Sequence, residues 1–225
     1  MHWLRALYNS SIGRKFVVAV TGAIMVLFLI GHMLGNLQAF EGRGPAGGTP
    51  RLNAYAHLLR VEMPALWTVR IVLLAALILH VWTTILLTLE NRKARPRRYA
   101  IHKKIETTLA TRTMIWGGLA LFAYVIYHIM HFTMGVVHRD LLTEGDVYDN
   151  VVRSFQVPWI SGVYIVAQFF LYMHLQHGVE SMFRTLGVDH PRYVAAARVF
   201  GHLLALVVAL GFIAVPVGVL AGAIR

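Results

Sequence analysis

The sequence predicts an all-α integral membrane protein with five transmembrane helices. Of its 225 residues, 57% are hydrophobic and only 14% are charged, whereas soluble domains carry about a quarter charged residues. The apolar residues fall into five stretches long enough to cross a bilayer. The connections between these stretches are too short to fold alone, so residues 1–225 are expected to form a single transmembrane domain.

The five predicted spans follow one another with short, polar connections. They cover residues 16–38, 66–89, 114–137, 159–183 and 194–221. The first is too long for the apolar region of a signal peptide and has no A-x-A-like cleavage site at its end, so it is expected to be retained. The last contains several glycines and Pro216 and is expected to lie at the periphery of the bundle.

The positive charge indicates the orientation. The net charge is +11, but the Lys and Arg residues are concentrated in the segments between spans, which argues against a nucleic-acid partner. Seven lie on one side of the predicted topology, and fourteen lie on the side of the N-terminus: Arg5, Arg14, Lys15, Arg92, Lys93, Arg95, Arg97, Arg98, Lys103, Lys104, Arg112, Arg184, Arg192 and Arg198. This bias predicts a multi-pass protein of the cell inner (cytoplasmic) membrane with a cytoplasmic N-terminus.

The chain contains no cysteine. Disulfides, thiolate zinc sites, cysteine-bound iron–sulfur clusters and covalent C-x-x-C-H haem attachment are therefore excluded. Any redox cofactor must be held by other ligands.

Histidines are the polar residues that distinguish the spans. Of the 12 histidines, seven lie within or at the edges of the spans: His32, His80, His128, His131, His174, His177 and His202. Ionisable residues inside a membrane face the bundle interior and mark functional sites. A single intramembrane histidine can equally well hydrogen-bond a neighbouring helix. Whether these histidines form a functional site is therefore judged from their distribution over the spans.

That distribution places four histidines at two depths. At about 1.5 Å per residue, His32 and His128 lie about 24 and 21 Å from the inner ends of the first and third spans. His80 and His174 each lie about 14 Å from the inner ends of the second and fourth spans. The sequence thus predicts an outer pair and an inner pair.

Two imidazole pairs at two heights are what two stacked bis-histidine b-type haems require. The first four spans are therefore expected to form a haem-binding bundle, with small residues beside the flat macrocycles at Gly31, Gly35, Gly117 and Gly178. His131 follows His128 by three residues, and His177 follows His174 by three. Spacing alone therefore does not decide which histidine of each couple is the ligand. His202 has no partner at its predicted depth near the inner interface and is expected to serve a hydrogen-bonding or interfacial role.

These residues resemble the single-chain, five-helix cytochrome b anchor of succinate:quinone oxidoreductases and fumarate reductases. The resemblance extends over nearly the whole chain. It rests on Ile30–Asn36 around His32, on Leu77–Val81 around His80, on Gly118 ten residues before His128, and on Tyr164-Ile165-Val166 before His174. It implies His32 and His128 as axial iron ligands of an outer haem b, and His80 and His174 as those of an inner haem b. It thus selects His128 over His131.

One position departs from the pattern. Some fumarate reductases of this type have a Glu two residues before the fourth ligand, where this chain has Tyr172. A proton path through such a carboxylate is therefore not expected here.

The resemblance implies a membrane anchor in a complex with a flavoprotein and an iron–sulfur subunit on the cytoplasmic face. The two haems would pass electrons between the iron–sulfur subunit and membrane quinone, with menaquinone expected, in either direction between succinate and fumarate. The chain itself shows no flavin or dicarboxylate site and no catalytic residue. The basic connection Arg92–Lys104 is a natural docking surface, although membrane topology and anionic lipid explain most of its charge.

Several alternatives stay open at this point. Paired intramembrane histidines also occur in the dihaem anchors of hydrogenases and formate dehydrogenases, and a transporter can use histidines as proton relays or metal ligands. The oligomeric state of the complex is not fixed. The quinone site is not assigned, since several polar residues lie near one or the other haem level: Asn36, Gln38, His57, His131, His138, Arg112 and His202.

Overall fold

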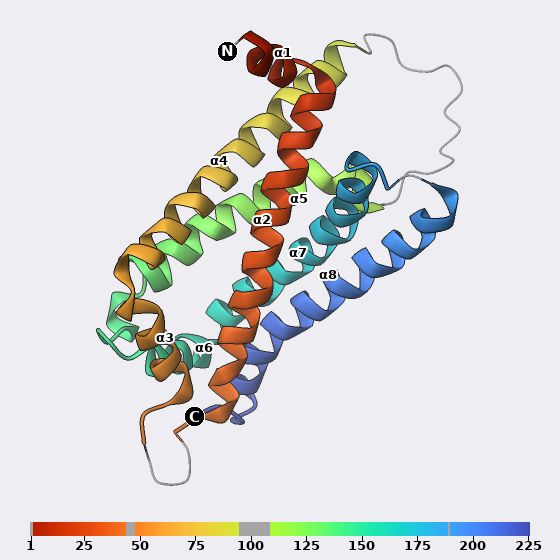
Figure 1. The fold of residues 1–225 in the computed structure, drawn as a ribbon. Coiled ribbons are helices and arrows are strands. Elements are labelled where there is room, and N and C mark those ends of the chain that lie inside the picture. Colours follow the sequence, from red (N-terminus) through yellow and green to blue (C-terminus); the bar gives the residue numbers. More distant parts are fainter. Residues whose placement is uncertain (1, 44–47, 95–108, 189) are drawn as a thin grey trace.

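The structure is a computed structural model that describes residues 2–43, 48–94, 109–188 and 190–225, and the regular elements in these ranges are all helical (Figure 1). This confirms the all-α fold class. In chain order the helices are α1 (His2–Asn9), α2 (Ser11–Leu37), η1 (Gln38–Glu41), α3 (Arg51–Val61), α4 (Met63–Lys93), α5 (Leu109–His128), η2 (Ile129–Thr133), η3 (Arg139–Leu141), α6 (Val147–Gln156), α7 (Pro158–Thr185) and α8 (Pro191–Leu220).

Each predicted span coincides for most of its length with one long helix, namely α2, α4, α5, α7 or α8. Among the described residues, four helical segments are long and apolar enough to cross a membrane, and they lie on α2, α4, α5 with η2, and α8. Helix α7 meets the same test only together with α6, from which it is bent by 98°. The reason is composition, because α7 carries Gln168, His174, Gln176 and His177 among its apolar residues.

The third span is shorter than predicted. Helix α5 changes to a π-helix at Ile129 and the helical geometry ends at Thr133, four residues before the expected Val137. Gly135 then adopts a left-handed conformation with φ of 61°, which glycine reaches without a steric penalty. The chain turns away from the helix axis at this point.

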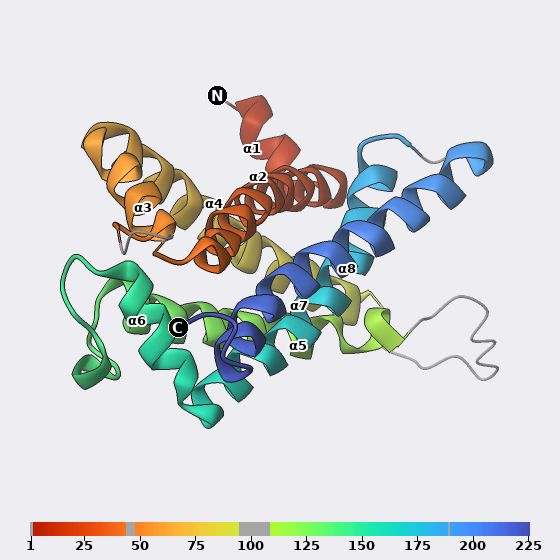
Figure 2. The same ribbon diagram turned by 90° about the horizontal axis from the view of Figure 1, so that it is seen from below.

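The long helices form two antiparallel hairpins with a fifth helix against them. Helix α4 packs along α2, and α5 packs along α7, while α8 packs on both α7 and α2 (Figure 2). The last span, expected at the periphery of the bundle, packs with one face on α7 and α2, while Leu203, Val207 and Leu210 on its other face are exposed. Its residues Ala205, Val208 and Ala209 are buried, and a Cβ at Gly201 would lie 3.3 Å from the carbonyl oxygen of Gln176. Small residues therefore bring α7 and α8 into close contact.

The sequence pattern did not predict helix α6. Its N-cap is Asp146, whose carboxylate accepts hydrogen bonds from the Asp149 amide (2.9 Å) and from Asn53 Nδ2 (2.8 Å). These bonds hold the pKa of Asp146 below its ordinary value. The apolar face of α6 is buried in a core shared with α7 and α8, which contains Tyr148, Val151, Val152, Phe155, Ile160, Tyr164, Val215 and Val219.

The chain ends and connections divide between the two ends of the bundle. The N-terminus, the end of α4 and the α7–α8 turn lie at one end, while α3, α6 and the C-terminus lie at the other (Figure 1). Near the N-terminal end the buried Arg14 pairs with Glu90, joining α2 to α4. Residues 95–104 of the basic connection lie outside the described residues.

Candidate functional site

The outer candidate pair consists of His32 on α2 and His128 at the end of α5. Their ring centroids are 5.8 Å apart and the planes are inclined by 76°. Aromatic rings enclose both imidazoles. Phe28 stacks on His32 at 5.3 Å and Phe212 of α8 approaches it at 5.7 Å, while the rings around His128 at 5.9 to 6.0 Å are those of Tyr124, Phe132 and Tyr164.

The inner candidate pair consists of His80 on α4 and His174 on α7, with centroids 6.3 Å apart. Thr21 fixes the tautomer of His80. The threonine hydroxyl donates to the carbonyl of Val17 (2.7 Å), so its oxygen accepts from Nδ1–H of His80 (3.1 Å). This leaves Nε2 of His80 as a neutral lone-pair donor, the form in which imidazole binds iron.

The two pairs lie at different levels of the bundle. A Cβ at Gly22 would lie 3.4 Å from Cε1 of His80, and His32 follows Gly22 by ten residues on the same helix. Ten residues of α-helix correspond to about 15 Å. The structure therefore brings together the histidines that the depth argument paired, at two separate heights.

The donor set fits haem iron. Nδ1 of His128 and Nδ1 of His174 are both buried, and neither has a hydrogen-bond partner within the described part of the chain. A buried polar atom without a partner is costly in free energy, and a bound ion or ligand is one way in which such an atom is satisfied. No group of three or more His, Cys, Asp or Glu side chains converges among the described residues; the histidines gather as pairs, as two axial positions require.

Two glycines lie beside the imidazoles of the inner pair. A Cβ at Gly118 would lie 3.6 Å from Cε1 of His174, which parallels Gly22 beside His80. By contrast, Gly35 lies against Tyr55, and Gly31 has no neighbour within 4 Å. Gly117 and Gly178 face Phe170 and Met114. Sequence spacing missed Gly22, although it precedes His32 by the same ten residues that separate Gly118 from His128.

His131 points away from the outer pair. It is fully buried, with Nδ1 3.0 Å from the Tyr164 hydroxyl and Nε2 3.1 Å from the Ser154 hydroxyl. Both ring nitrogens thus have protein partners, whereas Nδ1 of His128 has none among the described residues. Of these two candidates, the geometry favours His128 as the ligand.

The inner histidines outside the pair also have neighbours of their own. His177 interacts electrostatically with Glu180 and Arg184 toward the end of α7. His202 lies 3.2 Å from Gln176 Nε2 and 3.5 Å from the Tyr172 hydroxyl. These contacts agree with the hydrogen-bonding role expected for His202, which α8 carries three turns after its start at Pro191.

The other polar candidates are scattered. Asn36 Nδ2 donates to Nε2 of His32 (3.3 Å), and the Tyr127 hydroxyl lies 3.1 Å from Nε2 of His138. Gln38 begins η1, directly after α2, and His57 is exposed on α3. The side chain of Arg112 lies outside the described residues.

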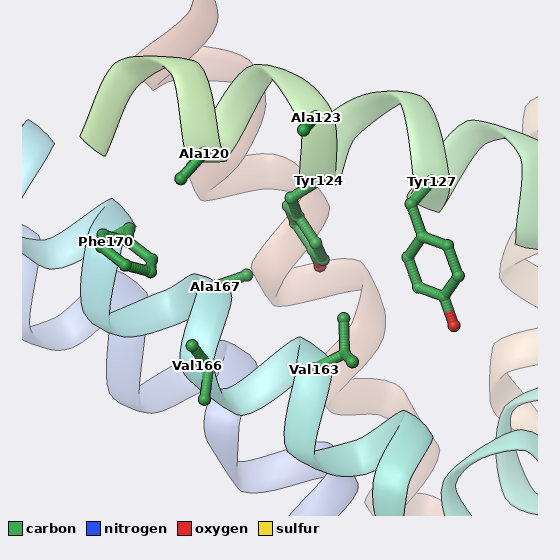
Figure 3. Close-up of a pocket in the computed structure, with 8 residues that line it drawn as sticks. All are labelled: Ala120, Ala123, Tyr124, Tyr127, Val163, Val166, Ala167 and Phe170. Atoms are coloured by element: carbon green, nitrogen blue, oxygen red, sulfur yellow. The ribbon is translucent and has the colours of Figure 1, made fainter. Parts of the chain in front are cut away.

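A groove of about 290 Å³ lies between α5 and α7 (Figure 3). Its walls are apolar apart from two phenol groups, and they consist of Ala120, Ala123, Tyr124, Tyr127, Val163, Val166, Ala167 and Phe170. Val163 and Val166 are 41% and 56% exposed, so this side of the groove faces the surroundings of the bundle. Tyr124 forms its inner wall and also contacts His128.

Comparison with protein families places the chain. Residues 88–217, more than half of the chain, match the model of the succinate dehydrogenase/fumarate reductase transmembrane subunit. The chain belongs to this family. Neither the comparison with curated proteins nor that with solved structures found a match.

The family assignment confirms the resemblance to the membrane anchor of complex II. The protein is thus a membrane subunit of a succinate dehydrogenase or fumarate reductase, and it is not the catalytic part of that enzyme. The matched residues include His128 and His174 but not His32 and His80.

Proposed function

We propose that this subunit is a dihaem cytochrome b anchor that carries electrons between the iron–sulfur subunit of complex II and membrane quinone. The observation that carries the proposal is the presence of two imidazole pairs, one from His32 and His128 and one from His80 and His174, at two levels of one bundle. Haem bound at both pairs would supply one-electron transfer across the membrane.

The protein residues would hold and shield these groups. His32 and His128 would supply the axial positions of an outer haem b, and His80 and His174 those of an inner haem b. Thr21 sets the tautomer of His80 by accepting a hydrogen bond from its Nδ1–H, a role that outer-shell hydrogen bonds commonly play at metal sites. The rings of Phe28 and Phe212 exclude water from one side of the outer pair.

Docking of the flavoprotein and the iron–sulfur subunit is proposed at the N-terminal end of the bundle. This end carries the basic residues Arg5, Lys15, Arg92 and Lys93, and the positive-inside rule puts it in the cytoplasm. The inner pair is the nearer of the two to this end, since His80 lies ten residues from Glu90 on α4.

The groove between α5 and α7 is proposed as the place where the quinone ring enters. It is apolar and opens beside exposed valines, as a lipid-borne ring requires. Tyr124 connects it to the outer pair. Replacing the groove residue Ala123 with Trp should lower quinone reduction while both haems are retained. The same change at Ala65, an exposed residue of α4, should leave the rate unchanged.

The deciding experiment is haem analysis of the purified complex. A dithionite-reduced minus oxidised spectrum, with haem quantified per chain and the accompanying subunits identified, should show two b-type haems. His32→Ala and His128→Ala should both remove one haem, and His80→Ala and His174→Ala the other. His177→Ala should retain both. Loss of the same haem from His32→Ala and His80→Ala would refute the pairing, and a complex without haem would refute the proposal.

A further inference from the structure

Three buried polar side chains lie beside the outer pair without belonging to it. His131 and Ser154 are fully buried and Tyr164 is 6% exposed. The two ring nitrogens of His131 lie 3.0 Å from the Tyr164 hydroxyl and 3.1 Å from the Ser154 hydroxyl. We call these residues the outer polar triad.

The outer polar triad joins three elements that contribute to the outer end of the bundle. His131 lies on η2, Ser154 on α6 and Tyr164 on α7. Its bonds lie in a largely apolar surrounding, where Phe132 stacks on His131 at 4.1 Å and Phe155 packs on Tyr164 at 5.0 Å. A buried hydrogen-bond network of this kind fixes one arrangement, because a partner removed from it leaves an unsatisfied group.

The π-helix separates the triad from the candidate ligand. In an α-helix, residues three apart lie on one face, so His128 and His131 would point in similar directions. In the structure His128 faces His32, whereas His131 faces α6 and α7. The π-helical turn begins directly after His128, and such turns are often found at functional sites.

Contacts lead from the triad back to His128. The ring of Tyr164 meets the imidazole of His128 edge to face, at 5.9 Å and 67°. Phe132, which stacks on His131, also contacts His128 at 5.9 Å. With the Tyr164 hydroxyl held by His131, and His131 in turn held by Ser154, the wall against which the imidazole of His128 rests is fixed.

We propose that His131, Ser154 and Tyr164 are positioning residues that set the orientation of the His128 imidazole and, through it, the electronic properties of the outer haem. This inference rests on the proposed function. It assigns no ligand role to the triad, and it predicts that breaking the triad alters one haem only, because the inner pair is built on α4 and α7 around Gly22 and Gly118.

The test uses the intact complex and two variants with a matched control. Ser154→Ala and Tyr164→Phe each remove one hydroxyl of the triad. Ser161→Ala removes another fully buried hydroxyl near the α6–α7 bend, which donates to the carbonyl of Phe155 and does not contact His131. The measurements are redox titration of each haem and the low-spin ferric EPR signals, which respond to the orientation of the axial imidazoles.

The expected result is that both triad variants retain two haems per chain but shift the midpoint potential and EPR g values of the outer haem. The inner haem should be unchanged, and Ser161→Ala should match the wild type. Unchanged outer-haem signals in Tyr164→Phe, which keeps the ring and the fold, would overturn the inference alone. Equal shifts of both haems would also overturn it. A wild-type complex without an outer haem would overturn the proposed function and the inference together.

Discussion

The ion pair between Arg14 and Glu90 offers a quantitative test of how the first hairpin is held together. The side chain of Arg14 is 11% exposed and that of Glu90 is 48% exposed. Arg14 also donates from Nε to the carbonyl of Tyr8 at 3.1 Å and packs over its ring. The guanidinium therefore links α1, α2 and α4 at one point.

The expected energies follow from these contacts. Glu90→Gln replaces a charge-assisted hydrogen bond with a neutral one and should cost about 1–2 kcal/mol. Arg14→Met keeps an apolar stem but loses the bonds to Glu90 and Tyr8, and should cost about 2–3 kcal/mol. The half-exposed Glu90 can be rehydrated once Arg14 is gone, so the double variant should cost little more than Arg14→Met alone.

The assay is a double-mutant cycle of reversible unfolding in mixed detergent micelles, followed by circular dichroism. The expected coupling energy is about 1–2 kcal/mol. The pair between Asp149 and Arg153 on α6 is the control. Its side chains are 29% and 50% exposed, and a pair four residues apart on a helix surface should couple by less than about 0.5 kcal/mol. Additive effects of Arg14→Met and Glu90→Gln would refute the reasoning.

Two further predictions concern the α6 cap and the contact between α7 and α8. Hydrogen bonds from Asn53 and a backbone amide lower the pKa of Asp146. The stabilising effect of its carboxylate is therefore present above the ordinary carboxyl pKa and lost as the pH falls through the lowered value. In an Asp146→Asn variant, the midpoint temperature of unfolding should depend less on pH between pH 7 and 3 than in the wild type. Gly201→Leu should lower stability by about 1–3 kcal/mol because it forces the Gln176 carbonyl away. Gly31→Leu, in open space, should have little effect in the same thermal unfolding assay.

The features that the sequence predicted well are those governed by a single helix. Spanning length follows from the run of apolar residues, and depth follows from the rise per residue, so the sequence alone is enough to match His32 with His128. Both quantities are insensitive to an error of a few residues at the helix ends. The bounds of α8, for example, differ from the prediction by three residues at the start.

The features that it missed depend on contacts between elements. Helix α6 is only ten residues long. A helix of this length is stable only when its apolar face packs on other elements, here α7 and α8. The π-helix after His128 depends on the partners that His131 finds on α6 and α7. The partners of His202, Gln176 and Tyr172, lie on α7, so they follow from the packing of α8 on α7.

The structure also shows how the two candidate sites depend on one another. The hairpin α2–α4 supplies Gly22, His32 and His80, and the hairpin α5–α7 supplies Gly118, His128 and His174 in the same order. In each hairpin the glycine of the outgoing helix lies beside the histidine of the returning helix. The two hairpins are therefore built alike, and every pair takes one imidazole from each.

Neither hairpin can form a pair alone, so the association of the hairpins is what creates both sites. Helix α8 contributes to that association because it packs on α2 of one hairpin and α7 of the other. Its Val208 and Ala205 share a buried cluster with Met33 of α2 and Leu175 of α7. A helix that carries none of the four paired histidines thus holds together the two halves that bear them through one face, while Leu203, Val207 and Leu210 on its other face are exposed.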